Sequence, residues 1–149
     1  MTASAVLVLE EQPLLLDTHV LVWSIDEGRK LGAGAKEAIR FAGREDRALV
    51  SAITPWEIAL LVSKGRLTLD QDVLNWVHTA LGLPGVRLVP LSVEIAVAST
   101  RLPWQIHADP ADRILVATAR NLGATLVTAD IALLEMAASG HFKAFDART

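Results

Sequence analysis

The sequence of 149 residues contains no cysteine. Disulfide bonds, thiolate catalysis and zinc sites built on cysteine are therefore excluded together. The longest unbroken apolar runs, at 5–9 and 58–62, have five residues each, whereas a membrane-spanning helix needs about 20. The N-terminal segment also lacks the basic start of a secretory signal peptide. These absences predict a protein that acts in the cytoplasm and has no membrane partner.

Positive charge is also scarce, because 14 basic residues stand against 17 acidic ones and give a net charge of −3. A protein that binds nucleic acid through its overall charge is expected to be basic, so any such binding here needs a local patch. Apolar residues make up 52% of the chain, which excludes intrinsic disorder. We expect one domain over 1–149, with residues 1–12 as a loose N-terminal extension.

Short apolar runs alternate along the chain with longer segments of helical periodicity. The runs predict strands at 13–16, 48–52, 86–91, 124–128 and 142–145. The periodic segments predict helices at 18–27, 33–44, 55–64, 70–81, 93–100 and 110–121. Buried strands separated by helices are typical of a parallel sheet covered on both faces. We therefore expect a three-layer α/β/α domain with a central, mainly parallel sheet of about five strands.

Four acidic residues fall where such a fold collects functional groups, which is the edge formed by the carboxyl ends of the strands. Asp17 directly follows the first strand, and one residue separates Asp130 from the strand at 124–128. Glu57 and Asp112 each occupy the third position of an expected helix. Four carboxylates from distant stretches of the chain could thus meet in one small volume.

Each of these acids also has a purely structural interpretation as a helix cap. Thr54 and Glu57 have the spacing of a capping box, and Asp109 before Pro110 is a natural N-cap. Asp112 would stabilise the helix dipole, and Asp17 and Asp130 could each cap the helix that follows. Against capping alone, Asp112 shares a helical stripe with three apolar residues, which aims it at the sheet: Leu115, Val116 and Ala119.

Clustered carboxylates that are partly buried need a counter-ion, because burying unpaired charge is costly. Oxygen ligands without cysteine or a histidine cluster favour Mg²⁺ or Mn²⁺ over Zn²⁺. Such ions support phosphodiester hydrolysis without a nucleophilic side chain. This agrees with the absence of a nucleophile elbow and of a phosphate-binding glycine loop.

Several short segments, in order, resemble the PIN-domain ribonucleases, and in particular the VapC toxins of bacterial toxin–antitoxin pairs. They are 15–19 (LLDTH) with Trp23 after it, 51–58 (SAITPWEI), 64–67 (KGRL), 102–103 (LP), His107, 109–113 (DPADR) and 126–130 (LVTAD). The resemblance covers roughly residues 14 to 131. The first twelve residues precede the usual start of the family, and the tail after Asp130 matches only loosely.

The resemblance implies a metal-dependent endoribonuclease that a cognate antitoxin, a small protein, keeps inactive. It implies an RNA substrate and a homodimer or a toxin–antitoxin hetero-oligomer. It also maps the acidic catalytic and metal site of the family onto Asp17, Glu57, Asp112 and Asp130. Asp109 matches the preceding acid of the DPADR segment, where we expect a cap or an outer-shell role.

Other polar and aromatic residues have both a functional and a structural interpretation. Lys36, Arg40 and Arg44 share one helix face and form either a track for the RNA backbone or a solvated surface. His107 could donate to a phosphate, orient Asp112 or make a structural hydrogen bond. Trp56, beside Glu57, could stack a base or belong to the core or an interface.

Two other functions remain open from the residues alone. One is a metal-dependent phosphatase-like hydrolase that uses Asp17 after the first strand. Phosphatases with an aspartate nucleophile need a second aspartate two residues later, where this chain has His19. The other is a non-catalytic α/β binding module whose acids are helix caps. Metal titration separates this module from a nuclease.

Overall fold

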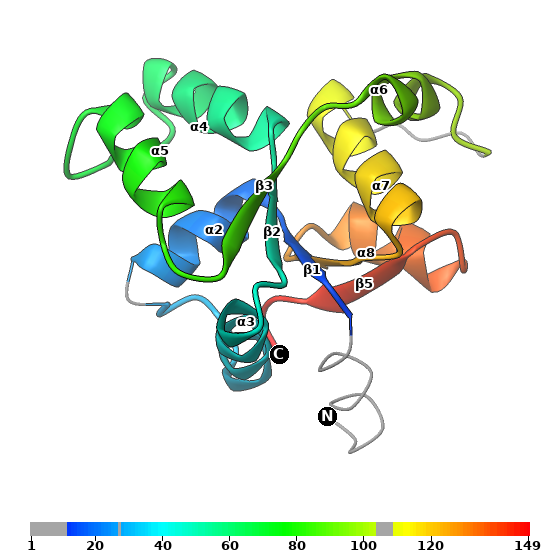
Figure 1. Ribbon diagram of the computed structural model, residues 1–149, viewed down its shortest axis with the longest axis horizontal. Helices are drawn as coiled ribbons and strands as arrows, with labels where there is room; N and C mark the ends of the chain where they lie inside the picture. Colours follow the sequence, from blue (N-terminus) through cyan, green and yellow to red (C-terminus); the bar gives the residue numbers. More distant parts are fainter. Residues whose placement is uncertain (1–11, 27, 104–108) are drawn as a thin grey trace.

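Five short parallel strands form the centre of the molecule, shown as a computed structural model in Figure 1. The structure describes residues 12–26, 28–103 and 109–149. The strand order is β3-β2-β1-β4-β5, and every neighbouring pair is parallel. The strands are β1 (Leu14–Leu16), β2 (Ala48–Ser51), β3 (Val86–Val89), β4 (Thr125–Thr128) and β5 (Lys143–Asp146). The expected parallel sheet is confirmed, and the expected strands agree with the observed ones to within two residues at each end.

Helices cover both faces of this sheet. Figure 1 shows α2, α3, α4 and α5 on one side and α6, α7 and α8 on the other. The seven helices are α2 (Thr18–Ile25), α3 (Ala33–Arg44), α4 (Ile53–Ser63), α5 (Val73–Leu81), α6 (Val93–Thr100), α7 (Pro110–Leu122) and α8 (Ile131–Ala138) in the described parts of the chain. The three-layer α/β/α architecture is thereby confirmed.

Strand β1 shows why the core has two halves. Its side chains alternate between the faces of the sheet, as the pleat of a strand requires. Leu14 and Leu16 belong to the core beneath α2 and α3, whereas Leu15 belongs to the core beneath α7 and α8. All three residues are buried, so β1 is the central strand that the apolar run predicts.

Strand β1 is the point at which the chain changes from adding strands on one side of the sheet to adding them on the other. From β1 it proceeds to β2 and β3 on one side, and then returns to β4 and β5 on the other. In open parallel sheets the crevice at such a switch point is the usual place for a ligand. The carboxyl ends of β1 and β4, which precede Asp17 and Asp130, flank this point.

Helix α5 begins at Val73, three residues after the expected start at 70, and two further features of the helices differ from the expectation. Helix α8 was not expected, although it lies between the last two strands. Helix α4 begins at Ile53, with Ala52 as its N-cap, so Pro55 is its third residue and not its first. Thr54 is therefore inside the helix and fully buried, and the capping box expected at Thr54 and Glu57 is wrong.

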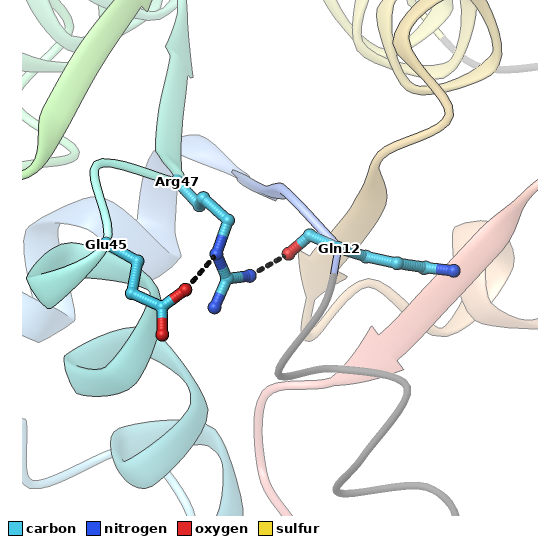
Figure 2. Close-up of polar contacts among 3 residues, drawn as sticks. All are labelled: Gln12, Glu45 and Arg47. Carbon is cyan, nitrogen blue, oxygen red and sulfur yellow. Dashed lines mark hydrogen bonds and ion pairs between the residues drawn. The ribbon is translucent and has the colours of Figure 1, made fainter.

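The start of β1 is held in place at the edge of the sheet that the amino ends of the strands form, as Figure 2 shows. The guanidinium of Arg47 lies 3.3 Å from a carboxylate oxygen of Glu45 and donates to the backbone oxygen of Gln12. The side-chain oxygen of Gln12 accepts a hydrogen bond of 2.8 Å from the Thr125 hydroxyl. Residue 12, grouped with the N-terminal extension in the expectation, is thus tied to the sheet, while residues 1–11 lie outside the described residues. In the described parts of the chain, no helix has the length and apolarity that crossing a membrane requires.

Candidate functional site

Asp17 stands between the end of β1 and the start of α2, where it is only 9% exposed. One carboxylate oxygen, Oδ1, accepts from the Thr18 amide at 2.7 Å, and the other, Oδ2, accepts from the Thr128 hydroxyl at 2.6 Å. Burial raises the pKa of Asp17, while these two hydrogen bonds and an electrostatic interaction with His19 act in the opposite direction. Asp17 caps α2, as one alternative predicts, and also lies at the carboxyl edge of the sheet.

Glu57 is the fifth residue of α4 and is half-buried. Its Oε1 accepts a hydrogen bond from the hydroxyl of Thr18, a residue of another helix. Burial raises the pKa of Glu57, and the charges of Asp17 and Asp109 raise it further. Glu57 therefore lies within electrostatic reach of acids from two other parts of the chain.

Asp112 is the third residue of α7, as expected, and is half-buried. The expected stripe is confirmed, since Leu115, Val116 and Ala119 are all buried. Burial, together with the charges of four neighbouring acids, raises the pKa of Asp112 from 3.8 to about 7; in decreasing order of effect these acids are Asp109, Asp17, Glu57 and Asp130. A purely capping acid at a helix start would have a lowered pKa, so this shift indicates a crowded acidic environment.

Asp109 and Asp130 both cap helices. Oδ1 of Asp109 accepts from the Asp112 amide at 2.9 Å, and Oδ1 of Asp130 accepts from the Leu133 amide at 3.2 Å. Both side chains are exposed. Each cap engages one carboxylate oxygen, and the second oxygen leaves room for a further role.

Three of the acids come close enough to share one cation. Carboxylate oxygens of Glu57, Asp109 and Asp112 all lie within 4.8 Å of one another. The structure thus brings Asp109 into the acidic cluster more directly than the sequence suggests. Asp17 and Asp130 add their charges to the same environment, as the pKa of Asp112 records. An all-oxygen donor set, in which burial and neighbouring carboxylates raise the pKa values of Glu57 and Asp112, fits a hard divalent cation.

Sequence reasoning missed two residues at this site. Thr18 contacts Glu57 through its hydroxyl, and an electrostatic interaction with His19 lowers the pKa of both Asp17 and Glu57. The signal was their position directly after Asp17, in the first turn of a helix that starts at the carboxyl edge. The hydroxyl of Thr128, at the end of β4, donates to the Asp17 carboxylate.

The basic residues proposed for RNA binding lie on α3, whose last residue, Arg44, comes shortly before the start of β2. That places Arg44 near the amino edge of the sheet, opposite the acids. A guanidinium nitrogen of Arg40 lies 3.6 Å from a carboxylate oxygen of Glu37. The guanidinium carbon of Arg44 lies 5.7 Å from the centroid of the Phe41 ring. His107 lies outside the described residues, so its expected role stays a prediction.

A comparison with protein families gives the class of this protein. The model of the PIN domain family matches residues 14–139, so the chain belongs to the PIN domain family. Ribonuclease VapC22 of Mycobacterium tuberculosis (strain ATCC 25618 / H37Rv) is 37% identical over 117 residues, which are 78% of this chain and 86% of that protein. The resemblance seen in the sequence is thereby confirmed.

Solved structures share the fold at lower identity. A chain of VapBC2 from Rickettsia felis, bound to a promoter DNA fragment, has a TM-score of 0.66 at 14% identity and covers 89% of this chain and 96% of its own. DNA-bound VapBC from Salmonella typhimurium has a TM-score of 0.64 at 16% identity and covers 91% of this chain and 98% of its own. FitAcB from Neisseria gonorrhoeae has a TM-score of 0.56 at 24% identity and covers 89% of this chain and 96% of its own. These likenesses establish the PIN fold over nearly the whole chain.

Proposed function

We propose that this protein is an endoribonuclease of the VapC type that hydrolyses RNA phosphodiester bonds with Mg²⁺ or Mn²⁺. Three findings support the proposal. The chain belongs to the PIN domain family, a relative at 37% identity is a ribonuclease, and three carboxylates meet at cation-binding distance. The last of these is the single observation that carries the chemistry.

The residues that would hold the ion are Glu57 and Asp112 with Asp109 beside them, while Asp17 and Asp130 complete the acidic site. When bound, the ion polarises a phosphoryl oxygen and lowers the pKa of a water molecule at the site. Hydrolysis joins the oxygen of water to phosphorus and leaves a proton on the departing ribose oxygen. The chain itself orients the carboxylates: Thr128 holds Asp17, and Asp109 holds the first turn of the helix that carries Asp112.

RNA would approach the exposed side of this site. Trp56 is 54% exposed on the first turns of α4, next to Glu57, and offers an aromatic face on which a base can stack. Helix α3 lies away from the acids and carries the basic residues Lys36, Arg40 and Arg44. These residues would contact the phosphates of an RNA long enough to reach them.

The proposed partner is a small antitoxin protein, and we expect a homodimer or a toxin–antitoxin hetero-oligomer in the cytoplasm. The support is family membership and the likeness to VapBC and FitAcB structures. An arginine or lysine of the partner would neutralise the carboxylates in place of the metal, because a positive charge stabilises the ionised form of acids whose pKa values are raised.

The residues favour neither alternative function. A phosphatase with an aspartate nucleophile needs a second aspartate two residues after Asp17, where this chain has His19. A non-catalytic module whose acids only cap helices accounts for Asp109 and Asp130. Such a module does not explain why the charges of four other acids raise the pKa of the half-buried Asp112.

The test is cleavage of a labelled RNA by the purified chain with Mg²⁺, with Mn²⁺ and with EDTA. We expect internal cleavage with either metal and none with EDTA. Undiminished cleavage with EDTA would contradict the metal dependence, and no cleavage of any RNA with either metal would contradict the nuclease.

A further inference from the structure

Thr18 joins two carboxylates that come from different elements. It is the first residue of α2 and is fully buried. Its amide donates to Oδ1 of Asp17 at 2.7 Å, and its hydroxyl donates to Oε1 of Glu57 on α4. The hydroxyl of Thr54, also fully buried, lies 3.5 Å from the Thr18 hydroxyl.

A buried threonine hydroxyl inside a helix can bond to a backbone carbonyl of the preceding turn. Thr118 does so: it is 1% exposed, and its hydroxyl donates to the Ile114 oxygen at 2.6 Å. Thr18 differs, because its proton goes to a carboxylate that belongs to the acidic cluster. Threonine has two favoured χ1 rotamers in a helix, and Thr18 adopts one that places its hydroxyl against Glu57.

We propose that Thr18 is a positioning residue that sets the orientation of the Glu57 carboxylate for cation binding, an inference that rests on the proposed function. With Oε1 engaged by Thr18, the carboxylate cannot rotate freely. Glu57 is then held at cation-binding distance from Asp109 and Asp112 before any ion arrives. The amide of Thr18 also donates to Asp17, so this one residue holds both Asp17, which follows β1, and Glu57 on α4.

The experiment measures the dissociation constant for Mn²⁺ from the metal-dependent rise of the melting temperature of the full chain. Thr18→Val keeps the shape and removes the hydroxyl, and we expect it to weaken Mn²⁺ binding about 10–100-fold, the range for residues that orient metal ligands. Thr18→Ser restores the hydroxyl and should bind nearly as the wild type does. The matched control is Thr118→Val, which removes an equally buried hydroxyl and should leave the dissociation constant unchanged.

A double variant adds an independent measurement. If Thr18 acts through Glu57, adding Thr18→Val to Glu57→Gln should weaken Mn²⁺ binding no further. Should Thr18→Val fail to fold, Thr18→Ala replaces it in both comparisons, because it also lacks the hydroxyl and imposes no β-branched side chain.

Three results would overturn the inference: wild-type affinity in Thr18→Val, equal weakening in Thr118→Val, or full additivity with Glu57→Gln. A wild-type chain that shows no metal-dependent shift is a different failure. It contradicts the proposed metal site itself and removes the inference with it.

Discussion

The hydroxyl of Thr128 donates to Oδ2 of Asp17 at 2.6 Å, which links the ends of two neighbouring parallel strands, β4 and β1. The same hydroxyl oxygen accepts from the Asp130 amide at 3.0 Å. One fully buried side chain therefore fixes an acid on each side of the switch point of the sheet. This contact stabilises the fold and organises the site at once.

Replacing Thr128 by valine should destabilise the protein, because it removes a hydrogen-bond donor from the buried Asp17 and an acceptor from the Asp130 amide. We expect the free energy of unfolding to fall by about 1–3 kcal/mol at neutral pH, measured by urea denaturation. Thr128→Ser keeps the hydroxyl and is the control. Equal stability of the valine and serine variants would show that the contact contributes nothing.

The stability of the metal-free protein should depend on pH in a direction set by Asp112. Its pKa is raised by burial and by neighbouring acids from 3.8 to about 7, so the folded state binds more protons than the unfolded state between these values. The free energy of unfolding should therefore decrease as pH rises from about 4 to about 7, and Asp112 should add no further decrease above that. The raised pKa values of Asp17 and Glu57 act with the same sign.

Urea denaturation in EDTA at a series of pH values measures this dependence. Asp112→Asn removes the titrating group and should flatten the curve. A wild-type stability that rises steadily over the same interval would contradict the assignment. Metal affinity should change the opposite way and fall below about pH 7, because the ligands must be deprotonated to bind.

Asp109→Asn separates capping from metal binding. Asparagine is about as good an N-cap as aspartate, so the hydrogen bond to the Asp112 amide and the stability should be retained. Because Asp109 also belongs to the carboxylate cluster, we expect Mn²⁺ affinity and RNA cleavage to fall by about 10–100-fold. If Asp109→Asn keeps both the Mn²⁺ affinity and the stability of the wild type, Asp109 is only a helix cap.

Much of the fold follows from the apolar pattern because buried parallel strands need short runs that are apolar on both faces. Leu14, Leu15 and Leu16 illustrate this, since they fill both halves of the core. Helix α8 escaped prediction because Glu135 is its one polar residue, so no polar face marks a helical period: of its large apolar residues Leu133 is buried, whereas Ile131 is 66% exposed. The order of the strands depends on pairing between distant segments, which no local pattern records.

The candidate site was partly predictable for a related reason. A residue directly after a strand or in the first turn of a helix has a defined place, which led to Asp17, Glu57, Asp112 and Asp130. The Thr18 contact with Glu57 depends on how α2 packs beside α4, and the approach of Asp109 to Glu57 depends on how α7 packs beside α4. Such contacts between helices are fixed by tertiary packing, so spacing along the sequence does not reveal them.

The most direct test of the account is RNA cleavage by Asp112→Asn, measured together with the melting temperature with and without Mn²⁺. The variant removes one charge from the acidic cluster, so the metal-free fold should be kept or made more stable. The account predicts no detectable cleavage and the loss of most of the metal-dependent rise in melting temperature. Normal cleavage by a folded Asp112→Asn variant would contradict the acidic metal site.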